Sequence, residues 1–101
     1  MKNEDIELVV LSRVATNLGI SITRAQESLK GGFYTKAVIE ELLKEHKKQN
    51  KIATDCYKTA LKVPRAAPIM VEYSRARKYV TVIEELIDKA NKSLIKMGRR
   101  N

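Results

Sequence analysis

The sequence predicts an all-α fold: a long antiparallel helical hairpin over about residues 34–63 and 69–97, with a short N-terminal pair of helices at one end. Apolar residues recur in alternating steps of three and four over residues 69–97, the spacing of a helix that packs lengthwise against another helix. The run over residues 39–63 repeats these steps and is the expected partner. Pro64 and Pro68 separate the two runs, because a helix interior does not accommodate proline. The 101 residues suffice for a single domain with one modest core.

The first helix is predicted to begin at Asn3, which is a suitable N-terminal cap. Acidic residues that favour the positive end of a helix follow at Glu4, Asp5 and Glu7. Apolar side chains lie nearly all round this helix, which predicts that it is largely buried: Ile6, Val9, Val10, Leu11, Val14 and Leu18. Gly19 can end the helix in the left-handed conformation, with Ile20 closing over it.

A short second helix is expected to start at either Ser21 or Thr23. Thr23 would form a capping box with Gln26, three residues further on. Gly31 and Gly32 are expected to end this helix.

The apolar stripe of each long helix, which we call its seam, is expected to join the two helices of the hairpin. The first seam is Ile39, Leu42, His46, Gln49, Ala53, Cys56, Ala60 and Val63. The second is Ile69, Tyr73, Ala76, Val80, Ile83, Ile87, Ala90, Leu94 and Met97, with Gly98 as the helix terminator. The polar run over residues 46–51 could bend or break the first long helix. Because the register recovers at Ala53 without a slip, we expect a continuous helix.

A second apolar row on the last helix lies beyond its seam, at Tyr79, Val82 and Leu86. A two-helix hairpin leaves such a row exposed, so either the first helix or another subunit must cover it. The sequence therefore predicts self-association or docking into a larger complex, with a partner contact at these three residues if the first helix does not cover them.

The formal net charge of +8 is distributed unevenly. Residues 1–50 contain 8 Lys and Arg against 7 Asp and Glu, whereas residues 51–101 contain 12 against 5. A compact basic domain attracts polyanions, such as nucleic acid or an acidic protein surface. We expect the C-terminal half of the chain to contact such a partner.

The cellular compartment is expected to be the cytoplasm. No apolar run reaches the length of a signal sequence or a membrane span, so no membrane contact is expected. Cys56 is the single cysteine and cannot form an internal disulfide, which suits a small buried side chain in a reducing compartment.

Catalytic chemistry is not expected. His46 and Cys56 are ten positions apart, about 15 Å along one helix, so they cannot act as a nucleophile and base pair in one subunit. The sequence has no cluster of metal ligands and no phosphate-binding loop, so we expect no metal, cofactor or small-molecule substrate. His46 itself is expected to be either partly exposed beside lysines or hydrogen-bonded to the hairpin partner or a second subunit.

Residues 11–30 resemble the helix-turn-helix of small bacterial and phage DNA-binding regulators. The resemblance rests on Val14, Ala15, Leu18, Gly19, Ile20, Ser21 and Ala25. It implies that Ser21 and Thr23 face phosphate, and that the residues reaching base edges are Arg24, Gln26, Glu27 and Lys30. The segment departs from the motif at Ser28, where an apolar residue normally packs inward, and at Ile22, where an exposed polar residue is usual. An ordinary capped turn between two helices would explain the same residues.

A basic stripe on the last helix is the second candidate for nucleic-acid binding. Its cations recur at three- and four-residue steps, interrupted by Val82 and Glu85: Arg75, Lys78, Lys89, Lys92, Lys96 and Arg99. Arg77, Tyr73 and Tyr79 flank its first cluster, and Arg100 extends the second. Cations mixed with aromatic rings suit a phosphate backbone and exposed bases. A solvated face, whose late lysines complement the helix dipole, would have the same sequence.

Two functions therefore follow from the sequence. The first is a non-enzymatic nucleic-acid-binding protein, for DNA or RNA, in which the basic stripe holds phosphates and the helix-turn-helix-like segment reads sequence. The second is a small helical protein-interaction subunit or accessory factor of a larger complex. The two overlap in a small helical subunit that lines nucleic acid inside a ribonucleoprotein, as in CRISPR effector complexes.

Overall fold

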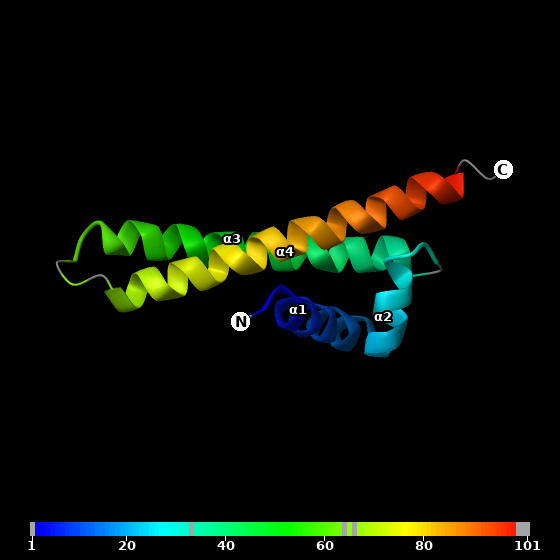
Figure 1. Ribbon diagram of the computed structural model, residues 1–101, viewed down its shortest axis with the longest axis horizontal. Coiled ribbons are helices and arrows are strands. Elements are labelled where there is room, and N and C mark those ends of the chain that lie inside the picture. The colour runs from blue at the N-terminus through cyan, green and yellow to red at the C-terminus, as the bar shows by residue number, and fades with distance from the viewer. Residues whose placement is uncertain (1, 33, 64, 66, 99–101) are drawn as a thin grey trace.

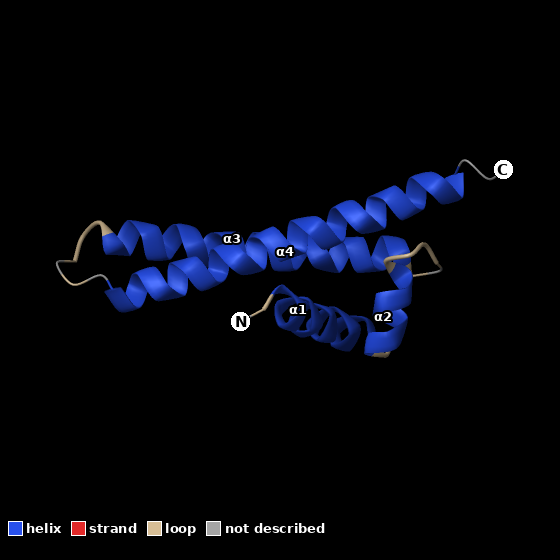
Figure 2. Cartoon of the chain, viewed as in Figure 1, coloured by secondary structure: helices blue, strands red, loops and turns tan. Residues whose placement is uncertain are grey.

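The computed structural model describes residues 2–32, 34–63, 65 and 67–98, with side chains up to residue 96. These residues form four helices and no strand: α1 (Asn3–Leu18), α2 (Ile22–Ser28), α3 (Thr35–Ala60) and α4 (Ala67–Gly98). The long helices α3 and α4 run antiparallel as a hairpin, and α1 and α2 pack against one part of it (Figures 1 and 2). The molecule is elongated, at 58 × 24 × 21 Å. The predicted all-α hairpin with a short N-terminal pair is confirmed.

The turn between α1 and α2 has the predicted glycine cap. Gly19 adopts a left-handed conformation with φ of 67°, and the Ile20 N–H donates to the Ala15 carbonyl at 3.0 Å. Of the two residues expected to start α2, Ser21 is the cap, because its Oγ accepts the Arg24 N–H at 3.1 Å. At the start of α1, Lys2 occupies the capping position without a side-chain hydrogen bond, so the prediction of Asn3 as the cap is wrong by one residue.

The hairpin helices differ slightly from their predicted bounds. α3 is continuous through residues 46–51, as expected, but it ends at Ala60 and not at Val63. Leu61 and Val63 are exposed, so no burial stabilises a longer helix. α4 begins at Ala67, before Pro68 and not after it. Proline is tolerated there because first-turn N–H groups have no partner within the helix.

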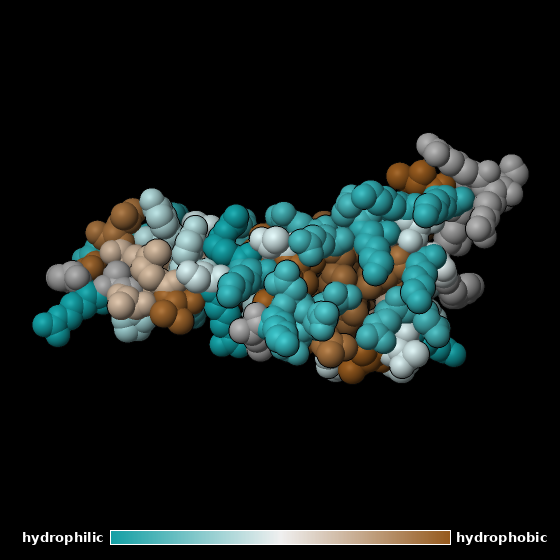
Figure 3. All heavy atoms as spheres, viewed as in Figure 1, coloured by the Kyte–Doolittle hydropathy of each residue, from teal (hydrophilic) through white to brown (hydrophobic). Residues whose placement is uncertain are grey.

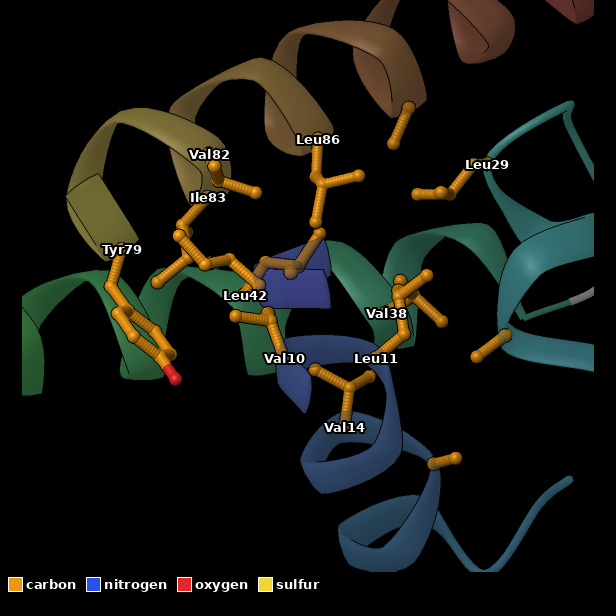
Figure 4. Close-up of a cluster of buried hydrophobic side chains, with 14 residues drawn as sticks. Val10, Leu11, Val14, Leu29, Val38, Leu42, Tyr79, Val82, Ile83 and Leu86 are labelled. Carbon is orange, nitrogen blue, oxygen red and sulfur yellow. The ribbon is translucent and has the colours of Figure 1, made fainter. Parts of the chain in front are cut away.

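The core is built where α1 meets both long helices. Buried side chains of α1, α3 and α4 converge there, with Leu29 at the end of α2 (Figure 4). Tyr79, Val82 and Leu86 belong to this core and are each 3% exposed. α1 is therefore the element that covers the second apolar row, and the predicted partner contact at these three residues is corrected, because their side chains are not accessible in the single chain.

The buried stripe of α3 is rotated from its predicted seam. The buried residues of α3 are Thr35, Val38, Leu42, Glu45, Gln49 and Ala53. The predicted seam is confirmed at Leu42, Gln49 and Ala53, whereas Ile39, His46, Cys56 and Ala60 are half-buried. The rotation arises because α1 packs on this side of α3. Asn17 donates to Glu41 at 3.3 Å, and Arg13 pairs with the buried Glu45 carboxylate at 3.6 Å. On α4 the predicted seam is confirmed at Ala76, Val80, Ile83 and Ala90, while the Met97 side chain lies outside the described residues.

No single helix among the described residues is both long and apolar enough to span a bilayer. The pair α1 and α2 reaches the required length and hydropathy only when taken together, across a bend of 103°.

Ile83 is expected to contribute more to stability than any exposed position on the same helix. It is 0% exposed in the core, so Ile83→Ala removes buried contacts and should lower the free energy of unfolding by about 2–5 kcal/mol. The matched control is Ile95→Ala, at a site 55% exposed, which should change it by no more than about 0.5 kcal/mol. Urea unfolding followed by circular dichroism measures both, and equal losses would contradict the assigned core.

Candidate nucleic-acid interface

A hydrogen bond joins the two segments that the sequence singled out for nucleic-acid binding. The Ser93 Oγ of α4 donates to the Leu29 carbonyl at 2.7 Å and also lies 3.1 Å from the Lys89 carbonyl. Leu29 follows α2 directly and is buried in the core. The C-terminal end of α2 is therefore held against the last third of α4.

Four lysines surround this contact. Lys30 follows Leu29, and Lys89 and Lys96 lie four residues before and three residues after Ser93, on its side of α4. Lys92 completes the set, and all four side chains are exposed. We call Lys30, Lys89, Lys92 and Lys96 the junction surface.

Nearby carboxylates neutralise little of the positive charge of the junction surface. Lys92 pairs with Asp88 at 3.0 Å, but both side chains are largely exposed, and such pairs are weak in water. The structure describes no ion pair for the other three lysines. The last turns of α4 run past the start of α3 (Figure 1), so the surface is open to a large partner.

The other cations predicted on α4 lie apart from the junction surface. Arg75, Arg77 and Lys78 are exposed, and Lys78 precedes Lys89 by eleven residues, about 16 Å along the helix. The Arg75 guanidinium lies 5.9 Å from the centre of the Tyr79 ring. Arg99 and Arg100 fall outside the described residues.

The two aromatic rings near this stripe, Tyr73 and Tyr79, are not fully exposed to solvent. Tyr79 is buried in the core. Tyr73 is half-buried, and its ring centre lies 6.0 Å from that of Tyr57 on α3. Tyr73 therefore packs within the hairpin, as its place on the predicted seam indicates, and Tyr79 packs in the core, so neither ring is placed to stack on bases and the outer face of α4 presents cations alone in its described part.

The geometry of α1 and α2 bears on the helix-turn-helix resemblance. Residues 19–21 join the helices and the chain direction changes by 103°, within the roughly 90–120° typical of that motif. Ser28, which departs from the motif, is buried with its polar groups satisfied. Its Oγ donates to the Arg24 carbonyl at 2.8 Å, and its own carbonyl accepts from the Thr35 Oγ1 at 2.7 Å. Ile22, the second departure, is exposed.

The candidate contacts on α2 are not equivalent. Thr23, Gln26, Glu27 and Lys30 are exposed, whereas Ser21 uses its Oγ as the helix cap. Arg24 lies against Tyr34, with its Nη1 3.5 Å from the phenol oxygen and its guanidinium 5.9 Å from the ring centre. A polar hollow of about 440 Å³ is lined by Arg24 and Tyr34 together with Glu27 and Gly32. Gln26 and Lys30 are thus freer than Arg24 to reach a ligand.

A second basic ridge, on α3, was missed by sequence reasoning. Its exposed lysines face away from the buried stripe of that helix: Lys44, Lys47, Lys51 and Lys58, continued by Lys62 beyond the helix end. The steps of three, four, seven and four residues are visible in the sequence and could have revealed the ridge. Lys44 pairs with Glu41 at 3.2 Å.

The single histidine and the single cysteine both lie on α3 and are half-buried. His46 is partly exposed, as one sequence alternative expects, and its Nε2 also lies 3.0 Å from Glu84 Oε1 of the hairpin partner, as the other expects, although this contact is not buried. Partial burial, and then the negative charges of Glu72 and Asp55, raise the pKa of the Cys56 thiol above its ordinary value. A raised pKa leaves less of the nucleophilic thiolate. Among the described residues no cluster of three or more His, Cys, Asp or Glu could hold a metal ion.

Comparisons with protein-family models, with curated protein sequences and with solved structures gave no match to this chain.

Proposed function

We propose that this protein binds nucleic acid through the junction surface, without catalysing a reaction on it. The observation that carries the proposal is the Ser93–Leu29 hydrogen bond, because it holds the helix-turn-helix-like segment beside the basic end of α4. Two features that are far apart in the sequence thereby become one continuous surface, with cations on α4 and exposed polar side chains on α2.

Phosphates are the chemical groups that this surface suits best. Lysine ammonium groups act as compact charges, and binding of phosphates by such groups releases condensed counterions. Lys89 and Lys96 are seven residues apart, about 10 Å along the helix, with Lys92 between them. This length matches about three phosphates of one strand if α4 lies along the duplex axis, where each strand has one phosphate per roughly 3.4 Å of rise. Lys30 adds a fourth charge from the turn after α2.

A double helix is a better ligand than a single strand for this surface. Proteins that bind single strands stack bases on exposed aromatic rings. Tyr79 is buried and Tyr73 packs on Tyr57, so the outer face of α4 offers cations without rings in its described part. Gln26 on α2 and Lys30 in the turn after it are both exposed and could enter a groove of a duplex.

Lysine substitutions test the phosphate contacts. Replacing Lys89, Lys92 and Lys96 with Gln should weaken binding to all duplex sequences alike, because phosphate contacts carry no base information. The slope of log K against log salt should fall by about 0.9 for each lost contact. Fluorescence anisotropy with a labelled 20-base-pair DNA, and with the corresponding RNA duplex, at several salt concentrations measures both quantities.

The α3 ridge provides the matched control for this experiment. Replacing Lys44, Lys47 and Lys51 with Gln removes the same charge from exposed positions and should leave most of the salt dependence in place. Equal effects of the two triple variants would mean that only net charge matters. Absence of duplex binding by the unaltered protein at low salt would refute the proposed function.

Gln26 is expected to affect sequence preference and not overall affinity. If α2 enters a groove, Gln26→Ala should reduce discrimination at one base pair by about 1–3 kcal/mol while leaving the salt slope unchanged. Selection of preferred duplexes from a random pool, with the unaltered protein and with the variant, measures this change. Thr23→Ala, at another exposed position on α2, is the control for a general disturbance of the helix. Identical selected sequences for the unaltered protein and the Gln26 variant would argue against reading by α2.

A further inference from the structure

A groove at the loop end of the hairpin lies away from the junction surface. It has a volume of about 560 Å³ and is lined by one residue of α1 and by the first turns of α4: Ile6, Ala67, Met70, Val71, Ser74, Arg75 and Lys78. We call it the α4 groove. The α4 residues in it recur at three- and four-residue steps, so they form one face of the helix about 16 Å long.

The end of the α4 groove nearest the loop is apolar and uncovered. Val71 is 71% exposed and Met70 is also exposed, whereas Ile6, which also lines the groove, is buried in the core. Figure 3 shows apolar side chains gathered over the end of the molecule where α3 and α4 are joined. α1 covers α4 only from about Tyr79 towards the C-terminal end of that helix. The groove occupies the uncovered part of α4 before Tyr79. Uncovered apolar surface of this kind is typical of a binding site for another protein.

The other end of the α4 groove is positively charged. Arg75 and Lys78 line it, and no carboxylate of the described residues lies within ion-pair distance of either. Glu72, three residues before Arg75, shares with it a second hollow that Gln49 and Arg13 also line, but the two side chains form no ion pair. Lys62 and Arg65 near the loop are exposed, and the N-terminal end of α4 adds the positive end of a helix dipole. The surroundings of the groove therefore favour an acidic partner.

We propose that the α4 groove binds an acidic amphipathic helix of a partner protein. Its apolar residues would pack on Met70 and Val71, and carboxylates one to two turns away would pair with Arg75 and Lys78. An apolar, helix-long groove with charges at one end is the usual arrangement for helix-in-groove recognition. Nucleic acid fits less well, since phosphates would leave the apolar end unburied. The proposal is independent of the proposed nucleic-acid binding, because it uses another part of α4.

Two synthetic peptides of 16 residues test the proposal. One carries leucine at positions 4, 7 and 8 and glutamate at positions 11, 12 and 15, and the other carries the same set in reverse order, so that both helix directions are sampled. The remaining positions are Ala and Gln, which favour a helix without adding charge. We expect saturable binding of one peptide by fluorescence anisotropy, and loss of at least about tenfold in affinity when its glutamates are replaced by Gln.

Variants of the protein locate the binding. Val71→Asp places a carboxylate at an exposed position, so it should preserve the fold by circular dichroism while weakening peptide binding about tenfold or more. Arg75→Glu with Lys78→Glu should weaken it similarly, and a peptide with lysine in place of glutamate should regain affinity for that variant. The matched control is Lys89→Glu with Lys92→Glu, which should alter peptide affinity less than twofold.

Three results would overturn the proposal. The first is that neither peptide binds at 1 mM. The second is that the peptide has equal affinity for the unaltered protein and for the folded Val71→Asp variant. The third is that the lysine peptide shows no gain in affinity for the charge-reversed protein. A fall in duplex affinity on Val71→Asp would instead assign the groove to nucleic acid. Loss of duplex binding in the Lys89, Lys92 and Lys96 variant, with peptide binding intact, separates the two sites.

Discussion

Two packed helices cannot cover each other's apolar faces completely. The structure depends on α1, which covers the apolar surface of the hairpin that the two long helices leave exposed. α4 has two apolar rows, one facing α3 and one containing Tyr79, Val82 and Leu86. Side chains of α1, with Val10, Leu11 and Val14 fully buried, cover the second row and close the core. Polar contacts from Arg13 and Asn17 to α3 then hold α1 at one position along the hairpin. With α1 in place, the Gly19 turn places α2 beside the last third of α4.

Helical spacing made most of the fold predictable from the sequence. The seam of α4, the glycine end of α1 and the uninterrupted α3 all follow from local rules about periodicity and capping. The buried stripe of α3 did not follow from them, because it depends on a third helix that contacts this side of α3. Glu45 illustrates the difficulty: a glutamate is typical of a protein surface, yet it is buried, and its Oε2 faces Arg13, 32 residues earlier in the chain, at 3.6 Å without a hydrogen bond.

The two parts of the candidate interface could each be predicted from the sequence, but their proximity could not. The exposed cations of α4 follow from spacing, and the residues of the turn after α1 follow from a motif. Their juxtaposition depends on the Ser93–Leu29 hydrogen bond between residues 64 positions apart, which no local pattern contains. The sequence placed Tyr79 in an apolar row that needs cover, but whether the first helix or another subunit covers it depends on the tertiary packing. The basic ridge of α3 is different, because its spacing was present in the sequence.

α1 and α2 cover only one part of the hairpin, so the two ends of the hairpin should open at different free energies. Near Ile83 the chain is packed from three helices, whereas near Tyr57 and Val71 it is only two helices thick and several apolar side chains face water. Backbone amides protected by few buried contacts exchange with solvent through local opening, at a lower free energy than global unfolding. The loop end of α3 and α4 should therefore fray as its own cooperative unit while the rest of the core stays closed. A ligand that covers this end would slow amide exchange there selectively, whereas one bound at the other end of α4 would leave it unchanged.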